Sequence, residues 1–173
     1  QWLEHLLPGF RRTHPDAGLR ELGAAFTAAG LDACRIGSGL LQNYWENPAP
    51  MGLPSAQIWP YWAEHPDLLE QAFTPSTGGY MDRYYQRHAR QNAFHALATF
   101  PQPPERLVPL LWKIALGGKS ERPPAQRCLE GLSDKFDRLT GALTGADAES
   151  RFAAAEWLGR IGDARAVDAL LAA

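Results

Sequence analysis

The residues best suited to binding chemistry are three arginines in the longest helical pattern of the chain, residues 80–99. Arg83, Arg87 and Arg90 are separated by four and three residues, which places them on one stripe of a helix. Guanidinium groups bind phosphate and carboxylate groups through paired hydrogen bonds, and the tyrosines between these arginines add aromatic surface. The stripe therefore predicts contact with phosphates or an acidic peptide. The alternative is that these arginines pair with acidic residues of the preceding segment.

Histidine and cysteine residues do not show the spacing of a metal site or of a nucleophile. His88 and His95 are seven residues apart, about 10 Å along a helix, which is too far for one metal without ligands from another element. Cys34 and Cys128 have no histidine nearby in sequence, and no Gly-x-Ser-x-Gly motif occurs. We therefore expect a non-enzymatic protein with no catalytic residue, no metal and no cofactor.

The charge of the chain is unevenly distributed. The formal net charge of −2 is far from that of a dedicated nucleic-acid binder. Residues 83–138, however, contain ten Lys and Arg against five acidic residues, whereas residues 1–82 contain four Arg against nine acidic residues. A basic middle segment suits either an anionic partner or an ordinary solvated face. Lys113 and Arg138 lie in this segment and join the arginine stripe as candidate partner-binding residues.

Localisation is predicted from what the sequence lacks. No apolar run reaches the roughly 20 residues that cross a bilayer, and the first residues do not follow a signal-peptide pattern. Two distant cysteines do not suggest a disulfide framework. We therefore expect a cytoplasmic protein without membrane association. The chain starts at Gln1 without a methionine and ends inside a helical pattern at Ala173, so we expect it to be a piece of a longer protein.

Helical patterns separated by proline and glycine clusters cover most of the chain, which predicts an all-α fold. The clearest break is the segment NPAPMGLPS, residues 47–55, where three prolines and a glycine exclude a regular helix. We therefore predict an N-terminal helical layer over residues 1–47 and a continuous helical array over residues 56–173.

The last segment, residues 150–173, contains two short amphipathic patterns separated by Gly162 and Asp163. Their predicted apolar faces consist of Phe152, Ala155, Leu158 and Gly159, and of Ala166, Val167, Leu170 and Leu171. Two such thin helices do not enclose a core alone, so they must stack on neighbours. Asp163 and Arg165 are predicted to cap the second helix and to pair between neighbouring repeats. The open apolar edge of the second helix predicts a following repeat or self-association.

Upstream segments overlay on this last pair. Residues 90–97 match residues 151–158, residues 105–111 match residues 164–170, and residues 127–143 provide a shorter third copy. The copies are irregularly spaced, which suits a helical-hairpin array better than a strictly periodic one. We therefore predict a superhelix of antiparallel helix pairs.

The stretch AAEWLGRIGDARAVDALLAA resembles a HEAT repeat, with an alanine-rich first helix, a Gly-Asp turn and Arg-Ala-Val opening the second helix. The upstream segments WPYWAEHPDLLEQAF, LVPLLWKIALGG and ERPPAQRCLEGL are similar to the helical part of large bacterial proteins of the molybdate-metabolism-regulator-like type. Those proteins carry a C-terminal domain of unknown function. The resemblance implies a HEAT-like alpha-alpha solenoid within a long cytoplasmic protein, and it assigns no catalytic residue here.

Three functions follow as hypotheses. The first is a scaffold that binds a protein partner along a concave surface. The second is nucleic-acid binding through the basic surface of residues 83–138, with the DNA-glycosylase-like chemistry that some HEAT-like proteins perform. That chemistry needs an exposed tryptophan and carboxylate in a basic channel, whereas the helical phase of Trp112 and Trp157 predicts burial. The third, a lyase related to bilin-attaching HEAT-like proteins, rests on the repeat resemblance alone.

Overall fold

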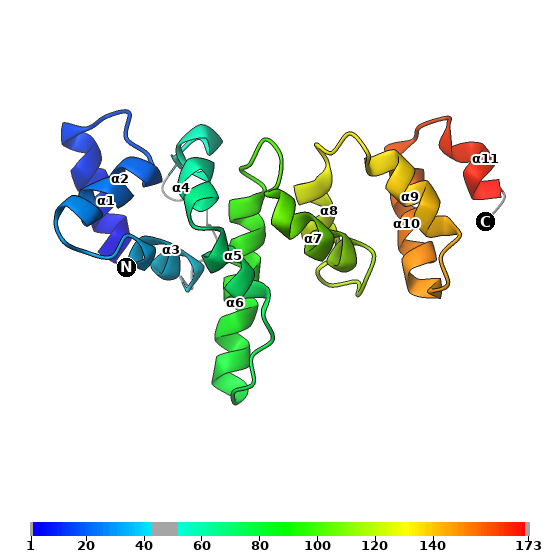
Figure 1. The fold of residues 1–173 in the computed structure, drawn as a ribbon, viewed down its shortest axis with the longest axis horizontal. Coiled ribbons are helices and arrows are strands. Elements are labelled where there is room, and N and C mark those ends of the chain that lie inside the picture. Colours follow the sequence, from blue (N-terminus) through cyan, green and yellow to red (C-terminus); the bar gives the residue numbers. More distant parts are fainter. Residues whose placement is uncertain (1, 43–51, 172–173) are drawn as a thin grey trace. The chain divides into compact units, whose positions relative to one another are not determined.

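The fold, taken from a computed structural model, is described for residues 2–42 and 52–171 (Figure 1). These residues form eleven α-helices and two short 3₁₀ helices, and no β-strand occurs among them. The predicted all-α class is thereby confirmed. The chain divides into two compact units, residues 1–100 and residues 101–173. The break predicted at residues 47–55 lies largely outside the described residues, and the domain limits derived from it stay a prediction.

The first unit contains six α-helices. They are α1 (Trp2–Thr13), α2 (Leu19–Ala28), α3 (Cys34–Leu41), α4 (Trp59–Glu64), α5 (Pro66–Phe73) and α6 (Tyr80–Leu97), with a 3₁₀ helix at Ser55–Gln57. Helix α2 packs on α4, and α3 packs on both α5 and α6. The fully buried side chains at these contacts include Leu19, Ile36, Tyr61 and Leu69. The long helix α6 is predicted correctly from its sequence pattern.

A buried tyrosine joins α4 to the start of α3. The Tyr61 hydroxyl accepts a hydrogen bond from the Gly37 N–H and donates one to the Ala33 carbonyl, both at 2.8 Å. Burial raises the pKa of this phenol, so it stays protonated and keeps its donor. The bonds fix the position of α3, which forms one wall of the pocket described below.

The second unit contains the remaining helices. They are a 3₁₀ helix at Glu105–Leu107, then α7 (Val108–Ala115), α8 (Arg122–Leu129), α9 (Lys135–Leu143), α10 (Ala148–Ile161) and α11 (Ala166–Leu171). The most extensive packing is between α7 and α8 and between α9 and α10. The sequence overlay instead paired α8 with α9 and α10 with α11. The most extensively packed pairs are thus shifted by one helix from the predicted pairs. Each helix of a stack packs on both the preceding and the following helix, so the sequence pattern fits either pairing.

The buried face of α10 differs from the predicted one. Ala153, Ala154, Trp157 and Leu158 are buried, whereas Phe152 is 60% exposed. Only Leu158 of the predicted face is correct as a core residue, because α10 turns Trp157 toward the Trp112 ring, at 5.5 Å between centroids. In α11 the side chain of Ala166 is buried, but Val167 and Leu171 are exposed among the described residues. Two of the apolar side chains predicted on this edge are therefore exposed, and the predicted following repeat or self-association stays a prediction.

The turn before α11 is closed by its own residues. Asp163 Oδ1 accepts a hydrogen bond from the Arg165 N–H at 2.9 Å, and the Arg165 Nε lies 3.0 Å from Asp163 Oδ2. The Arg165 guanidinium also lies 4.4 Å from the centre of the Phe136 ring in α9. Asp163 thus closes the turn that precedes Ala166, the first residue of α11, and its predicted role as the helix cap stays a prediction. The predicted pairing between repeats is wrong, because the arginine comes from the same turn and contacts α9 through a cation–π interaction.

Candidate functional site

The first half of α6 exposes large aromatic and sulfur-containing side chains. Tyr80 is 74% exposed, Met81 is 52% exposed and Tyr85 is 45% exposed. Helix α6 packs on α3 and α5 mainly through its second half, where Ala93, Phe94 and Leu97 are buried. Figure 1 shows the first half of α6, in green, extending past α5 within the first unit. This surface, which we call the α6 surface, comprises Tyr80, Met81, Arg83, Tyr85 and Arg87.

The arginine stripe is divided by the fold. Arg83 and Arg87 are exposed on the α6 surface. Arg90 is half-buried, and its guanidinium carbon lies 5.9 Å from the centre of the Phe73 ring in α5. The third arginine therefore helps to pack α5 against α6, and two of the three predicted residues lie where a partner could contact them. Their predicted role in binding stays a prediction.

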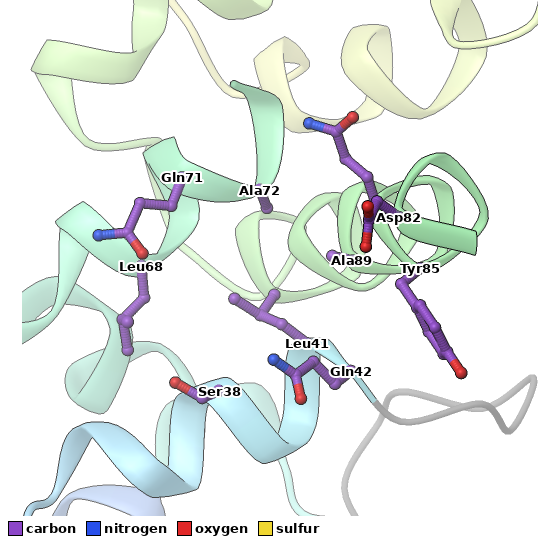
Figure 2. A pocket seen from close by; sticks show the side chains of 10 residues that line it. Ser38, Leu41, Gln42, Leu68, Gln71, Ala72, Asp82, Tyr85 and Ala89 are labelled. Carbon is purple, nitrogen blue, oxygen red and sulfur yellow. The ribbon is translucent and has the colours of Figure 1, made fainter. Parts of the chain in front are cut away.

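A pocket of about 520 Å³ lies beside the α6 surface, between α3, α5 and α6 (Figure 2). Its lining consists of Ser38, Leu41, Gln42, Leu68, Gln71, Ala72, Asp82, Tyr85, Gln86 and Ala89. The lining combines aliphatic side chains with three glutamine amides, two hydroxyls and a carboxylate. Two of the polar groups are already used locally: Gln86 accepts a hydrogen bond from the Ser76 N–H, and Asp82 accepts one from the Gly79 N–H. Sequence reasoning missed this pocket.

The phase of α6 explains why the arginines do not line the pocket. Successive residues of an α-helix are rotated by about 100°, so Asp82, Gln86 and Ala89 share one face. Arg83 and Arg87 lie about 100° further around the same helix. The pocket and the arginines are consequently on adjacent faces of α6, with Tyr85 common to the pocket and the exposed surface.

The structure also brings together a cysteine and a histidine that are far apart in sequence. The Cys34 Sγ lies 3.7 Å from Nδ1 of His65. Burial raises the pKa of the Cys34 thiol, and Asp32 raises it further through hydrogen bonding and charge repulsion. A nucleophilic cysteine needs the opposite shift, toward thiolate. This pair therefore lacks the electrostatics of an activated nucleophile.

The two candidate residues of the second unit differ in their surroundings. Lys113 is exposed on α7. Arg138 donates to Asp134 at 2.6 Å, and its guanidinium carbon lies 5.7 Å from the centre of the Trp112 ring. The charge of Arg138 is thus already paired one helical turn away, whereas Lys113 extends into solvent. Neither observation tests the predicted contact with a partner.

The two tryptophans that a base-excision site would require are packed in the second unit. Trp112 is buried, and Trp157 is only 2% exposed. The Trp157 indole N–H donates to Glu130 Oε1 at 3.2 Å. Their predicted burial is confirmed, so neither ring is available to stack on an extruded base.

Searches for other site classes cover the described residues only. In residues 2–42 and 52–171, no group of three or more His, Cys, Asp or Glu side chains is arranged to hold a metal ion. Over the same ranges, no helix combines the length and the apolar composition that crossing a bilayer requires.

Comparison with known proteins identifies a repeat family in the last segment of the chain. The family model of the PBS lyase HEAT-like repeat matches residues 150–173, which contain α11 and all of α10 except its first two residues. The chain has no match among curated proteins or among solved structures. The similarity to molybdate-metabolism-regulator-like proteins receives no support from these comparisons. Together with the all-α architecture, the match identifies a helical protein that carries a HEAT-like repeat at residues 150–173.

Proposed function

We propose that this chain is a non-enzymatic helical-repeat scaffold that binds a protein partner. The observation that carries the proposal is the α6 surface. Tyr80 is exposed on the same face of the helix as Arg83 and Arg87, and Met81 and Tyr85 are exposed on the opposite face, next to the pocket. Tyrosine, methionine and arginine are the residue types enriched at protein interfaces, and tyrosine and arginine dominate their energetic hot spots. A partner that covers this surface would remove several large apolar groups from water.

The neighbouring pocket supplies the concave part of the same surface. Its aliphatic floor, formed by Leu41 and Leu68 among others, suits an apolar side chain of the partner. The amides of Gln42 and Gln71 on its wall offer both donors and acceptors to a peptide backbone. Tyr85 borders both regions, so we expect its truncation to weaken binding more than truncation of any other residue of the α6 surface.

The HEAT-like repeat at residues 150–173 also supports a scaffold function. A HEAT-like repeat presents helices in tandem, an arrangement suited to extended contact with other proteins. Lys113 and Arg138 are retained as further candidate contacts in the second unit. Self-association through the exposed Val167 and Leu171 of α11 is part of the same proposal. We place the chain in the cytoplasm of a bacterium.

A photo-crosslinking experiment tests the α6 surface directly. Benzoylphenylalanine replaces Tyr80 in one variant and Leu31, an exposed residue of the same unit, in the matched control. We expect one discrete protein adduct from position 80 only. Adding Tyr85→Ala should lower the affinity of the identified partner about 30-fold, the effect of losing a hot-spot residue of about 2 kcal/mol. Equal adducts from both positions would contradict the proposal.

The alternative function is nucleic-acid binding, and a variant of the α6 surface distinguishes it from binding of a protein partner. If Arg83 and Arg87 contacted phosphates, affinity for an oligonucleotide would fall steeply between low and moderate salt, and Arg87→Glu would abolish it. We expect no salt-dependent binding of oligonucleotides in fluorescence anisotropy. A steep salt dependence that Arg87→Glu removes would favour nucleic acid over a protein partner.

A further inference from the structure

Two adjacent hollows lie on one side of the second unit. The smaller, of about 250 Å³, is lined by Lys119, Arg122, Pro123, Gln126, Phe152, Glu156 and Arg160. The larger, of about 450 Å³, is lined by Pro123, Gln126, Arg127, Glu130, Lys135, Trp157, Arg160 and Ile161. Because they share Pro123, Gln126 and Arg160, they form one continuous depression over α8 and α10. We call this depression the α8–α10 groove.

The acidic residues of the groove are engaged by internal partners. Glu156 accepts a hydrogen bond from Arg122 at 3.2 Å. Arg122 is only 4% exposed, and it also donates to the Gly117 carbonyl just after the end of α7. Glu130 pairs with Lys135 and accepts the indole N–H of Trp157. Both carboxylates therefore balance cations that belong to the packing of the unit.

Three exposed cations of the groove keep their charge unbalanced. Within the described part of the chain, no carboxylate lies within ion-pair distance of Lys119, Arg127 or Arg160. Glu156 precedes Arg160 by one helical turn, the usual spacing of a helical ion pair, but its carboxylate is bonded to Arg122 instead. Arg160 donates to the side-chain oxygen of Gln126, a bond that holds its guanidinium over the groove.

Positive charge inside a concave surface concentrates the field that an anionic ligand meets. The groove also exposes apolar surface, because the Phe152 ring lines the smaller hollow and Ile161 lines the larger one. Phe152 is 60% exposed, so most of its ring is accessible to a ligand. A ligand that fits both features carries carboxylates and apolar side chains close together.

We propose that the α8–α10 groove binds an acidic peptide segment that contains apolar side chains. Carboxylates of the segment pair with Arg160, Lys119 and Arg127, and an apolar side chain packs on Phe152. A nucleic-acid strand is the competing anionic ligand, and the oligonucleotide probe distinguishes it from the peptide. This binding site lies in the second unit and does not depend on the α6 surface, so each proposal can fail without the other.

Fluorescence anisotropy with the full chain tests the groove. The probes are a labelled twelve-residue peptide that alternates Glu and Leu, the same peptide with Lys for Glu, one with Ser for Leu, and a single-stranded oligonucleotide. We expect binding of the Glu–Leu peptide only, weakening as salt rises because the ion pairs are screened. Arg160→Ala and Lys119→Ala should each weaken it about fivefold, the upper range for exposed ion pairs. Phe152→Ala should weaken it as well.

Arg35→Ala, which removes an exposed arginine of the first unit, is the matched control for net charge. We expect this variant to bind the Glu–Leu peptide as the wild type does. Absence of peptide binding, equal weakening by Arg35→Ala, or tighter binding of the oligonucleotide would each overturn the proposal. Circular dichroism checks the fold of each variant. Lys119→Ala keeps the test decisive if Arg160→Ala disturbs α8, because the Lys119 side chain makes no hydrogen bond within the described residues.

Discussion

Gly37 of α3 lies against side chains of α4 and α5, and it has no room for a side chain of its own. A Cβ at this position would lie 2.6 Å from Cδ1 of Leu68 and 3.0 Å from the Tyr61 hydroxyl oxygen. The Gly37 N–H also donates to that hydroxyl, so moving the backbone away would break a buried hydrogen bond. A glycine that weakens the helical pattern of α3 in the sequence is thus required by its neighbours.

The variant Gly37→Ala should therefore destabilise the protein. The added methyl group must displace Leu68 or Tyr61, and overpacking of this kind costs about 1–3 kcal/mol of unfolding free energy. Gly9→Ala is the matched control, since no atom lies within 4 Å of a Cβ there and alanine favours helix α1. Urea denaturation should show a lower midpoint for Gly37→Ala and an unchanged or higher one for Gly9→Ala. Equal midpoints would mean that α3 adjusts without strain.

At the scale of an element, α10 depends on the residue that precedes it. Asp147 Oδ2 accepts a hydrogen bond from the Ser150 N–H at 2.8 Å, which satisfies one of the unpaired amides of the first turn. Hydrogen bonding by the Ser150 side chain and amide lowers the pKa of Asp147 below its ordinary value. The carboxylate form of Asp147 is thus the one that stabilises α10, the helix that carries Phe152, Trp157 and Arg160.

The cap gives stability a specific dependence on pH. Because the pKa of Asp147 is lower in the folded than in the unfolded chain, its contribution is complete above the unfolded pKa and is lost as pH falls through the folded pKa. Asparagine also caps helices but does not titrate. The wild type should therefore exceed Asp147→Asn in unfolding free energy at neutral pH, and this difference should shrink as pH falls below the ordinary aspartate pKa of about 3.9 and through the lower pKa of folded Asp147. Urea denaturation across that pH range checks the result, and a constant difference would contradict it.

At the scale of the whole molecule, local signals predict the helices better than their faces. Pro66 and Pro109 occupy first-turn positions of α5 and α7, and Gly117 follows the end of α7, so these limits can be read from the sequence. The orientation of α10 cannot, because Phe152 and Trp157 are both apolar and only packing against α7 and α9 decides which is buried. Helix pairing is similarly ambiguous in a stack where every helix has two neighbours.

The candidate sites also show that local sequence patterns predict residues on one helix but not contacts between helices. The arginines of α6 lie on one helix, so their spacing alone predicts Arg83 and Arg87 as neighbours. The pocket collects residues from α3, α5 and α6, and the groove joins α8 to α10, so no local pattern marks either one. Whether a carboxylate balances the charge of Arg160 depends on whether Glu156 pairs with Arg160 or with Arg122. Only the three-dimensional structure shows that Glu156 pairs with Arg122.

The two cysteines follow the division of the chain, with Cys34 in the first unit and Cys128 in the second. Cys34 is partly accessible, whereas burial raises the pKa of the Cys128 thiol to about 12. At pH 8 only about one Cys128 in ten thousand is then the reactive thiolate. A disulfide reagent such as DTNB should therefore release one equivalent of chromophore from the native chain and a second only as urea opens the second unit. Simultaneous release of both equivalents in native buffer would contradict this, whereas the staged reaction would make Cys128 an intrinsic chemical reporter of local opening around α8.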